Sequence, residues 1–591
     1  MASPKRVRAR SGLQPKKRPT RKTAGKPGKS GGETGATKAR AKAQATHVAV
    51  PGSTRPRTRG ATRIKAAPSQ AHVEVTITLS GPKLPDPGQS AGALSAGEFK
   101  ARYSASKSDA AKVAQTLRKF GLAIEQVSLE TRSMKVSGTV AQMEAAFHPN
   151  LAIYQSADQG TYRDRESDYK IPDALKGIIT AVIGFGERQV ALRKRALKRS
   201  HRRKPGPRHN LASVVGRLSP LGPADIENLY HFPPGDAAGQ KIAIAELGGG
   251  YFASDLRAYC ARFKRPTPNV KTIPINMPVR GLSQIRRLKR SEQQDEMDYT
   301  GEVMMDVQIV AGLCPAAEIS VYFATFDQKG WVDLLDRVIR DKPVAVSVSW
   351  GSAEDSSDWS DAARLAINER LNAAALLGIT ICVAAGDDGT GDEQTDGNSH
   401  VDFPSCSPFV LAVGGTMLGE HGGKVIEQVW REGHGKRTGN GGGATGGGVS
   451  TTFQRPNWQK VKIKSLNKGS IDGRVVPDIT ALAGPPWYDL VWLGRNTYGG
   501  GTSASAPVLA SLIARVNALL PAGKGRRYLT PLLYRKSPHG AEVGRFVCHD
   551  ITIGNNASMP KPGVGYVATK GFDAVSGWGT PIGTALLLAL T

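Results

Sequence analysis

The 591-residue sequence predicts an α/β protein in which helices cover both faces of a mainly parallel sheet, preceded by a smaller α+β domain. In the larger part, almost continuously apolar runs such as 241–246 and 344–350 alternate with helical stretches such as 301–311 and 503–520. Strands that are apolar on both faces are typical of parallel sheets between layers of helices. In such sheets, functional side chains gather where strands end and the next helices begin.

The formal net charge of +30 is concentrated in two stretches. Residues 1–66 hold nineteen Lys/Arg and one acid, and residues 188–208 hold ten Lys/Arg and no acid. The rest is nearly neutral, which argues against a nucleic-acid-binding core, because a groove for phosphates keeps its charge on the folded domain. Five cysteines without CxxC spacing indicate neither a disulfide scaffold nor a zinc cluster. No apolar run reaches the ~18 residues that span a bilayer, and no signal peptide is visible.

Composition divides the chain into four segments. Residues 1–66 have too few large apolar side chains to offset the entropy of ordering, which predicts a disordered basic tail. Whether this tail binds a polyanion or is a solvated extension stays open. Residues 67–187 are expected to form an α+β ferredoxin-like domain. Residues 188–212 form a basic linker of the kind that proteases cut, and residues 213–591 form the α/β domain.

The elements of the small domain follow from local patterns. A strand, a long helix capped by Ser95 and ended by Gly121, two further strands, a second helix and a hairpin are expected in that order. Their ranges are His72–Leu79, Ser95–Phe120, 124–129, 133–137, 140–147 and 151–163.

The strongest chemical motif is Gly500–Pro507, which reads Gly-Gly-Thr-Ser-Ala-Ser-Ala-Pro and opens a helix rich in Ala and Leu. Two glycines allow a tight turn. Ser503 would then have its hydroxyl beside unpaired backbone N–H groups that can hold a developing oxyanion. An ordinary Ser or Thr N-cap is the alternative for Gly-Thr-Ser alone, but the full octapeptide favours a nucleophile.

A nucleophilic serine needs a base, and none of the eleven histidines lies in the sequence context of such a base. The helix predicted over 301–311 has Glu302 and Asp306 instead, which share one face because they are four residues apart. Two carboxylates on an apolar helix are costly unless they share a proton or have partners. The alternative interpretation is that the two acids are exposed on a solvated face of the helix. The apolar neighbours Val303 and Val307 disfavour this alternative.

A buried β-type run over 379–384 leads into Gly386 and Asp387. An aspartate at such a position is commonly a turn former or a cap. If Asp387 is protonated, however, it can donate a hydrogen bond to an oxyanion.

Residues 433–448 are rich in glycine but lack the GxxxxGK[ST] pattern of a phosphate-binding loop. We therefore expect a surface loop there.

These motifs together resemble the sedolisin, or serine-carboxyl peptidase, family, and the small domain resembles the prodomain of that family. The matching stretches are Leu94–Phe99, Val136–Phe147, Ile242–Tyr251, Gly301–Gly312, Ser347–Asp355, Ala384–Gly389, His400–Pro404, Gly447–Phe453 and Gly500–Pro507. The resemblance implies a subtilisin-like catalytic domain and a serine-type endopeptidase zymogen. It also implies polypeptide substrates, inhibition by the chain's own prodomain, and self-activation by cleavage within 188–212.

The resemblance implies a role for each catalytic position. Ser503 is expected to be the nucleophile, Glu302 the general base and then acid, and Asp306 the residue that orients Glu302. Asp387 is expected to be the oxyanion-hole acid and Asp402 a substrate-pocket acid. Glu246 and Trp350 are expected to form an outer hydrogen-bonding shell around the acid pair.

One structural calcium ion is also implied by the resemblance. Asp550 and Asp573 would supply side-chain oxygens, and Ile551, Thr569 and Gly571 would supply carbonyl oxygens, as suits a cation that prefers oxygen ligands. Two aspartates in turns are by themselves commonly turn residues. Thr569 stands where the family usually has glycine.

Catalysis by carboxyl groups predicts an acidic optimum, because a carboxylate base has low basicity and Asp387 must stay protonated to donate. Acid is also the expected trigger of activation, since protonating carboxylates weakens ion pairs between domains. The family resemblance implies an extracellular protein, although no signal peptide is visible. A non-catalytic binding protein on the same fold, or a protein attached to a polyanion by its basic tail, are the alternatives.

Overall fold

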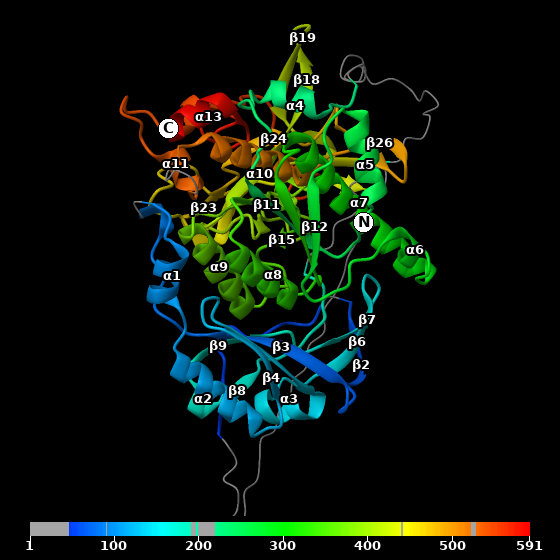
Figure 1. Ribbon diagram of the computed structural model, residues 1–591, viewed down its shortest axis with the longest axis vertical. Helices are drawn as coiled ribbons and strands as arrows, with labels where there is room; N and C mark the ends of the chain where they lie inside the picture. Colours follow the sequence, from blue (N-terminus) through cyan, green and yellow to red (C-terminus); the bar gives the residue numbers. More distant parts are fainter. Residues whose placement is uncertain are drawn as a thin grey trace, which may run out of the picture. The chain divides into compact units, whose positions relative to one another are not determined.

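The structure is a computed structural model (Figure 1), and it describes residues 46–58, 60–89, 92–190, 197–198, 219–438, 441–521 and 527–591. Residues 1–45 of the predicted tail lie outside the described residues, as do residues 191–196 and 199–212 of the predicted linker.

An eight-stranded sheet forms the centre of the large domain, residues 219–591. Its strand order is β12-β13-β11-β14-β16-β18-β19, with β24 paired to β18. Among the described strands of this sheet, only β19 runs antiparallel to its neighbour. The mainly parallel sheet that the apolar runs predict is therefore confirmed. The strands span Lys241–Leu247 (β11), Asn269–Pro274 (β12), Glu318–Ala324 (β13), Ala345–Val348 (β14), Thr380–Ala384 (β16), Leu411–His421 (β18), Lys424–Val429 (β19) and Ile479–Leu482 (β24).

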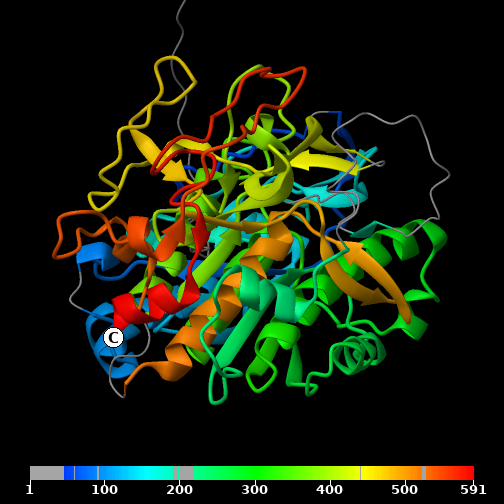
Figure 2. The same ribbon diagram turned by 90° about the horizontal axis from the view of Figure 1, so that it is seen from above.

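Helices cover both faces of this sheet, and the alternation of side chains along β11 shows how. Ile242 and Ile244 belong to the apolar cluster with α7 and α10, whereas Ala243 and Ala245 belong to the cluster with α8 and α9. Figure 2 shows α10 (orange) crossing the middle of the domain, with the C-terminal α13 (red) beside one of its ends. The helices span Arg290–Leu313 (α7), Gln328–Asp341 (α8), Asp361–Leu376 (α9), Thr502–Leu519 (α10) and Gly583–Leu590 (α13).

Shorter elements surround this layered core. They are α4 (Pro223–Leu229), α5 (Ala253–Arg262), α6 (Leu282–Ile285), α11 (Thr530–Tyr534), α12 (Gly544–Val547), β15 (Ser352–Ala353), β17 (Asp402–Phe403), β20 (Arg431–Thr438), β21 (Gly441–Ala444), β22 (Gly448–Gln454), β23 (Gly473–Val476), β25 (Tyr488–Trp492), β26 (Arg495–Gly499), β27 (Cys548–His549) and β28 (Thr580–Pro581).

The small domain has a four-stranded antiparallel sheet with the order β4-β5-β3-β9. Along the chain the elements follow as strand, helices, two strands, helix and strand, which is the ferredoxin-like arrangement that the sequence predicts. The strands span His72–Leu79 (β3), Ala123–Ser128 (β4), Ser133–Thr139 (β5) and Ile179–Ile183 (β9), and the helices Ala96–Tyr103 (α1), Lys107–Arg118 (α2) and Val140–Phe147 (α3). The predicted hairpin is formed by Ala152–Ser156 (β6) and Gly160–Asp164 (β7).

The long helix expected over Ser95–Phe120 is wrong in one respect, because the structure has two helices there. Ser95 caps α1 as expected, but the chain is extended at Ser104 and Ser106. The Ser106 side chain accepts a hydrogen bond from the Asp109 backbone N–H and so starts α2. Helical periodicity continues through the break, which is why the pattern did not reveal it.

The expectation that the chain is disordered through residue 66 is also wrong for residues 46–58 and 60–66. His47–Ala49 (β1) pairs with Lys170–Pro172 (β8), and Thr62–Ala66 (β2) pairs with β6. Between these strands the guanidinium of Arg55 is buried against the Asp164 carboxylate, 3.4 Å away. This stretch is ordered by partners about 100 residues further along the chain, which local composition does not show.

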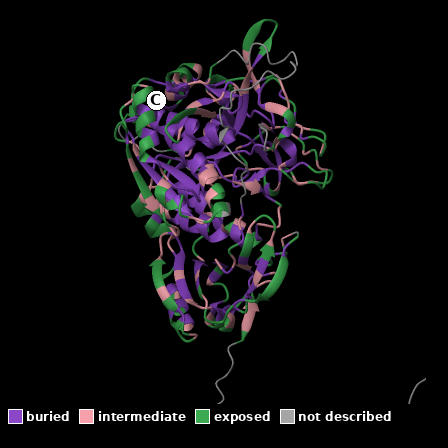
Figure 3. Cartoon of the chain, turned by 90° about the vertical axis from the view of Figure 1, so that its right-hand side faces the viewer, coloured by how far each residue is buried: buried purple, intermediate pink, exposed green. Residues whose placement is uncertain are grey.

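The sheet of the small domain packs on α8 and α9 of the large domain (Figure 1). Phe99, Ala181 and Ile183 are part of the apolar cluster that contains the buried faces of those two helices. Figure 3 shows that buried residues (purple) fill the interior of the large domain. Among the described residues, no helix has the length and apolar character needed to cross a membrane.

Candidate active site

Ser503 is the second residue of α10 and is fully buried. The N-cap is Gly501, whose φ of 105° lies in the left-handed region that glycine adopts readily. A Cβ on Gly501 would lie 2.6 Å from Asp387 Oδ2. Only glycine therefore lets the start of α10 approach Asp387. Because Ser503 lies inside the helix, it does not play the part of an ordinary N-cap.

Glu302 and Asp306 lie one turn apart on α7, and both are buried. The alternative of two exposed acids on a solvated face is therefore excluded. Ser349, directly after β14, joins this pair to the serine: its hydroxyl contacts Asp306 Oδ2 and lies 3.1 Å from the carbonyl oxygen of Ser503. Ser503 Oγ in turn lies 3.5 Å from the carbonyl oxygen of Ser349. The sequence patterns did not single out Ser349, although it lies within the matching stretch Ser347–Asp355.

Glu246 and Trp350 lie next to each other beside this group. The indole N–H of Trp350 donates to Glu246 Oε2 over 3.0 Å, and both residues are buried. Glu246 is near the end of β11 and Trp350 follows β14, so adjacent parallel strands bring the two side chains to one edge of the sheet.

Asp387 follows β16 and faces the first turn of α10. Its Oδ1 accepts hydrogen bonds from the backbone N–H and the side-chain hydroxyl of Thr502, each over 2.8 Å. Thr502 precedes Ser503, so these bonds place the Asp387 carboxyl next to the predicted nucleophile. They also exclude a role for Asp387 as a turn former alone.

Arg437, on β20, forms an ion pair with Asp387 Oδ2. The same guanidinium donates to the carbonyl oxygen of Gly500 over 3.1 Å. Hydrogen bonds to a carboxylate and an adjacent positive charge both favour its ionised form. Arg437 comes from the glycine-rich stretch for which we expected a surface loop. That expectation is wrong at its centre, since β20 and β21 form a hairpin whose Ala444 is buried.

A cavity of about 200 Å³ opens beside Asp387. The large domain lines it with a largely acidic set of side chains that includes Asp387, Asp388, Asp392 and Asp402. Burial, with repulsion from Glu393, raises the pKa of Asp388 to about 7. Burial and the neighbouring Asp402 raise the pKa of Asp392 well above its usual value. The predicted pocket acid Asp402 is buried on β17, which pairs with β15.

Residues of the small domain and the linker also line this cavity. Their lining residues are Thr58, Ser156, Asp158, Gln159, Arg188 and Gln189. The Val190 backbone N–H donates to the carbonyl oxygen of Phe326 over 2.8 Å, and Ser352 Oγ donates to the carbonyl oxygen of Val190 over 2.7 Å. Further on, Leu197–Lys198 (β10) pairs with Tyr498 and Gly499, directly before the serine motif. The described linker residues therefore lie at the candidate site.

The five residues predicted to bind calcium meet in one place. Asp573 Oδ2 accepts the Thr569 backbone N–H over 2.7 Å, and Asp550 Oδ2 accepts the Gly571 backbone N–H over 2.7 Å. Ser576 Oγ lies 2.9 Å from Asp573 Oδ1 and 3.4 Å from the Ile551 carbonyl oxygen. Burial raises the pKa of Asp573 to about 6. Within the described ranges, no group of three or more His, Cys, Asp or Glu side chains is arranged to hold a metal, so such a site depends on carbonyl oxygens.

A subtilisin-like sheet, a serine at the start of a central helix and buried carboxyl groups beside it define the serine-carboxyl class of peptidases. The family model described as pro-kumamolisin, activation domain, matches residues 59–188, and the subtilase family model matches residues 297–547. Kumamolisin from Bacillus sp. (strain MN-32) is 37% identical over 500 residues, which cover 83% of this chain and 85% of kumamolisin. The chain therefore belongs to the sedolisin family of serine-carboxyl peptidases, and with its activation domain it is a zymogen.

A further relative and a solved structure agree with this assignment. Sedolisin from Pseudomonas sp. (strain 101) is 26% identical over 507 residues, covering 82% of this chain and 79% of sedolisin. The solved structure of Pseudomonas sedolisin, a serine-carboxyl proteinase complexed with two molecules of pseudo-iodotyrostatin, superimposes with a TM-score of 0.52 at 26% identity. It covers 63% of this chain and 97% of that structure. The subtilisin-like fold expected from the sequence is thereby confirmed.

Proposed function

We propose that the protein is a serine-type endopeptidase that cuts polypeptides at acidic pH with a Ser-Glu-Asp triad of Ser503, Glu302 and Asp306. The observation that carries the proposal is the link through Ser349, whose hydroxyl contacts Asp306 and lies 3.1 Å from the Ser503 carbonyl oxygen. This link joins the buried acids of α7 to the first turn of α10.

In the proposed reaction, Ser503 Oγ attacks the carbonyl carbon of the scissile peptide bond, and the serine proton passes to the Glu302 carboxylate. Glu302 then returns that proton to the leaving amine as the C–N bond breaks, and water repeats both steps to release the acyl group. Asp306 orients Glu302. Because the two acids share one face of a buried helix, the pair holds a proton more readily than isolated carboxyl groups do.

Asp387 is proposed to hold the oxyanion together with the backbone N–H of Ser503. To donate a hydrogen bond, Asp387 must be protonated, whereas its bonds from Thr502 and its ion pair with Arg437 favour the carboxylate. A fall in pH supplies the missing proton. This requirement supports an acidic optimum independently of the Glu302 base.

The prodomain, residues 46–190, is proposed to act as inhibitor until the chain cuts itself within residues 188–212. The contact of Ser156, Asp158 and Gln159 with the cavity of the catalytic domain supports this role. Asp402, which also lines that cavity, is proposed to bind a substrate side chain.

Activity across pH tests the triad. We expect the purified full-length chain to shorten itself and to cut an unfolded protein at acidic pH, and Ser503→Ala and Glu302→Gln to lose about 10⁴-fold or more in rate. Internal cuts in a long peptide would support an endopeptidase, whereas stepwise release of short N-terminal fragments would contradict it. A non-catalytic binding protein on the same fold would show no peptidase activity at any pH. Equal shortening of the parent and Ser503→Ala would overturn the proposal.

One structural calcium ion is also proposed, bound by Asp550 and Asp573 with the carbonyl oxygens of Ile551, Thr569 and Gly571. The donor set fits a hard cation because all of its atoms are oxygens. Asp573 is buried with a pKa raised to about 6, so a nearby cation would stabilise its charged form. When bound, the ion would tie the segment around 550 to the turn at 569–573.

A separate proposal concerns the basic tail. Residues 1–45 hold fourteen Lys/Arg and one acid, a charge that suits binding to a polyanion. Because residues 46–58 and 60–66 are folded, the deletion that tests this proposal removes residues 1–45 only. Unchanged retention on a polyanionic resin would contradict it. We also propose an extracellular location, from the family resemblance, which secretion by the native host would test.

A further inference from the structure

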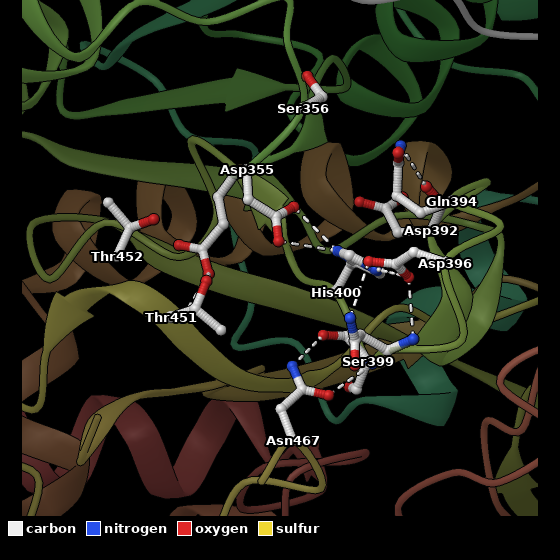
Figure 4. Close-up of polar contacts among 12 residues, drawn as sticks. Asp355, Ser356, Asp392, Gln394, Asp396, Ser399, His400, Thr451, Thr452 and Asn467 are labelled. Carbon is white, nitrogen blue, oxygen red and sulfur yellow. Dashed lines mark hydrogen bonds and ion pairs between the residues drawn. The ribbon is translucent and has the colours of Figure 1, made fainter. Parts of the chain in front are cut away.

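The imidazole ring of His400 lies between the carboxylates of Asp355 and Asp396 (Figure 4). Its Nδ1 is 2.9 Å and 3.0 Å from the two carboxylate oxygens of Asp355, and its Nε2 is 2.8 Å from Asp396 Oδ1. The side chain of His400 is 4% exposed. Each ring nitrogen of a buried histidine therefore faces a hydrogen-bond acceptor.

This geometry determines the protonation state of His400. An ionised carboxylate only accepts hydrogen bonds, and neutral imidazole has a single N–H, so two carboxylates are satisfied together only by the imidazolium. Burial lowers the pKa of His400, but the hydrogen bonds and charges of Asp355 and Asp396 outweigh burial and raise it. Burial by itself raises the pKa of Asp396, but the hydrogen bonds from Asn398 and His400 outweigh burial and lower this pKa to about 2.

The other charged groups near this ring are mostly acidic. Asp388, Glu393 and Asp402 surround Asp392 on the cavity side, and Glu354 precedes Asp355. Lys561 brings a positive charge to the cavity loop, where its Nζ donates to the carbonyl oxygen of Thr395 over 3.3 Å. The surroundings therefore favour a positive charge on His400.

The three residues of this contact do not line the cavity themselves, but each lies within two residues of one that does. Asp355 follows β15, whose Ser352 and Ala353 line the cavity. Asp396 belongs to residues 391–399, here called the cavity loop, which lines the cavity with Asp392, Glu393 and Gln394. His400 itself lies two residues before the pocket acid Asp402. The imidazolium thus ties the cavity loop to β15 and to β17.

The other described contacts that hold the cavity loop are polar. Residues 393 and 395–398 are exposed, and the loop has no large apolar side chain to bury. The Gly391 backbone N–H donates to Ser558 Oγ over 2.9 Å at one end of the loop, and Lys561 donates to the carbonyl oxygen of Thr395. Asn467 exchanges two hydrogen bonds with the backbone of Ser399 at the other end, over 2.8 Å and 2.7 Å (Figure 4). A segment with few apolar contacts depends on its polar contacts for its position.

We propose that His400 is a pH-dependent positioning residue for the substrate cavity: as an imidazolium it holds the cavity loop against β15, and on losing its proton it releases the loop. This inference rests on the proposed peptidase function only for its effect on substrate. The contact of a group with a raised pKa is complete at low pH and is lost as pH rises through that pKa. The loop is therefore held in the acidic range and released above it, so that substrate binding weakens at high pH while the Ser503 chemistry is untouched by this contact.

The first test does not need activity. In the full-length Ser503→Ala chain, hydrogen exchange of residues 391–399, corrected for the intrinsic effect of pH, is measured at pH 5 and pH 8. Protection is expected to fall severalfold between these values, because the contact weakens as pH rises through the raised pKa of His400. In Ser503→Ala with His400→Gln, protection is expected to be low at both. Asp396→Asn repeats the test without disturbing the core, because the Asp396 side chain is 51% exposed. His539→Gln removes an exposed histidine elsewhere and should match the parent.

The second test uses the activated enzyme with a peptide substrate at acidic pH. His400→Gln and Asp396→Asn should raise KM about tenfold with little change in kcat, and the KM of the parent should rise toward theirs as the pH increases. Protection that is independent of pH, or equal in the parent and both variants, would overturn the inference, as would variants that lower kcat alone. A parent that shows no peptidase activity would contradict the proposed function, while the exchange test would still decide the role of His400.

Discussion

Replacing Lys135 on the prodomain by methionine should speed activation, because it removes one ion pair across the interface with α8. Lys135 Nζ lies 3.1 Å from Asp333 Oδ2, and the side chain of Asp333 is fully buried. The carboxylate keeps three other partners: Lys329 Nζ and Thr76 Oγ1, each 2.7 Å away, and Asn276 Nδ2 at 3.5 Å. The loss of free energy at the interface is therefore smaller than the roughly 3–5 kcal/mol that follows when a buried charge loses its only partner. It is larger than the ~0–1 kcal/mol that a surface ion pair contributes. We expect about 1–2 kcal/mol, or roughly a five- to thirtyfold faster loss of the prodomain.

The sign of the pH dependence follows from the same carboxylate. Burial pushes the pKa of Asp333 up, but Lys329 and Lys135 outweigh burial and lower it. A carboxyl group whose pKa is lowered by a partner contributes stability at higher pH, and that contribution is lost as pH falls through the lowered pKa. Removing Lys135 should therefore make activation faster and also less dependent on acid.

The assay follows the shortening of the full-length chain on a denaturing gel over time at several pH values. The control is Glu130→Gln, which removes the more exposed pair with Lys342, where both side chains are about one-fifth exposed and the charges are 3.3 Å apart. The activation rate of that variant should differ from the activation rate of the parent by less than about fivefold. If Lys135→Met activates no faster than Glu130→Gln at any pH, the ion pairs at α8 do not hold the prodomain in place.

Three further changes test other parts of the account. Ser349→Ala should lower kcat roughly 10- to 100-fold with little effect on KM, because it removes the hydroxyl between Asp306 and Ser503. The control is Ser505→Ala on the same helix as Ser503, which removes a hydroxyl that donates to backbone carbonyl oxygens of β24. Equal losses in the two variants would count against the role of Ser349. Arg437→Met should extend peptidase activity upward by one to three pH units, the usual effect of an adjacent opposite charge on the pKa of a carboxyl group. The control Lys436→Met removes an exposed charge one residue away and should leave the pH profile unchanged. An unchanged pH profile in Arg437→Met would refute the proposed role of Asp387 as the oxyanion-hole acid. A calcium chelator should lower the melting temperature by several degrees near pH 7 and by less near pH 4, and Asp573→Asn should remove this sensitivity, as scanning calorimetry would show. The reason is that protons compete for Asp573, whose pKa is about 6; without the ion, stability should fall as pH rises from about 4 to about 6.

Much of this fold could be predicted because the signals were local. The apolar run at Lys241–Leu247 and the helix with Glu302 and Asp306 each reveal burial within a few residues of sequence. The glycines before Ser503 predict the close approach that the φ of Gly501 bears out. Local patterns also placed the hairpin of the small domain, because strand alternation needs no distant partner.

The remaining features depend on residues that are distant in the chain. Strands β1 and β2 are ordered by partners in β8 and β6, so their basic composition misled the prediction of disorder. Arg437 reaches Asp387 only because the β20–β21 hairpin folds over the end of β16. His400 gave no signal as a lone histidine, since one of its two carboxylates, Asp355, lies 45 residues away in the chain.

The central claim is that Ser503, Glu302 and Asp387 act together on one peptide bond. The most direct measurement is a crystal structure of the activated enzyme at acidic pH with a peptide aldehyde, which serine peptidases trap as a hemiacetal. We predict a covalent bond from Ser503 Oγ to the aldehyde carbon, with the Glu302 carboxyl within hydrogen-bond distance of that oxygen and Asp387 turned from Arg437 toward the hemiacetal oxygen. An aldehyde bound without this bond, or a hemiacetal that neither carboxyl group reaches, would contradict the account.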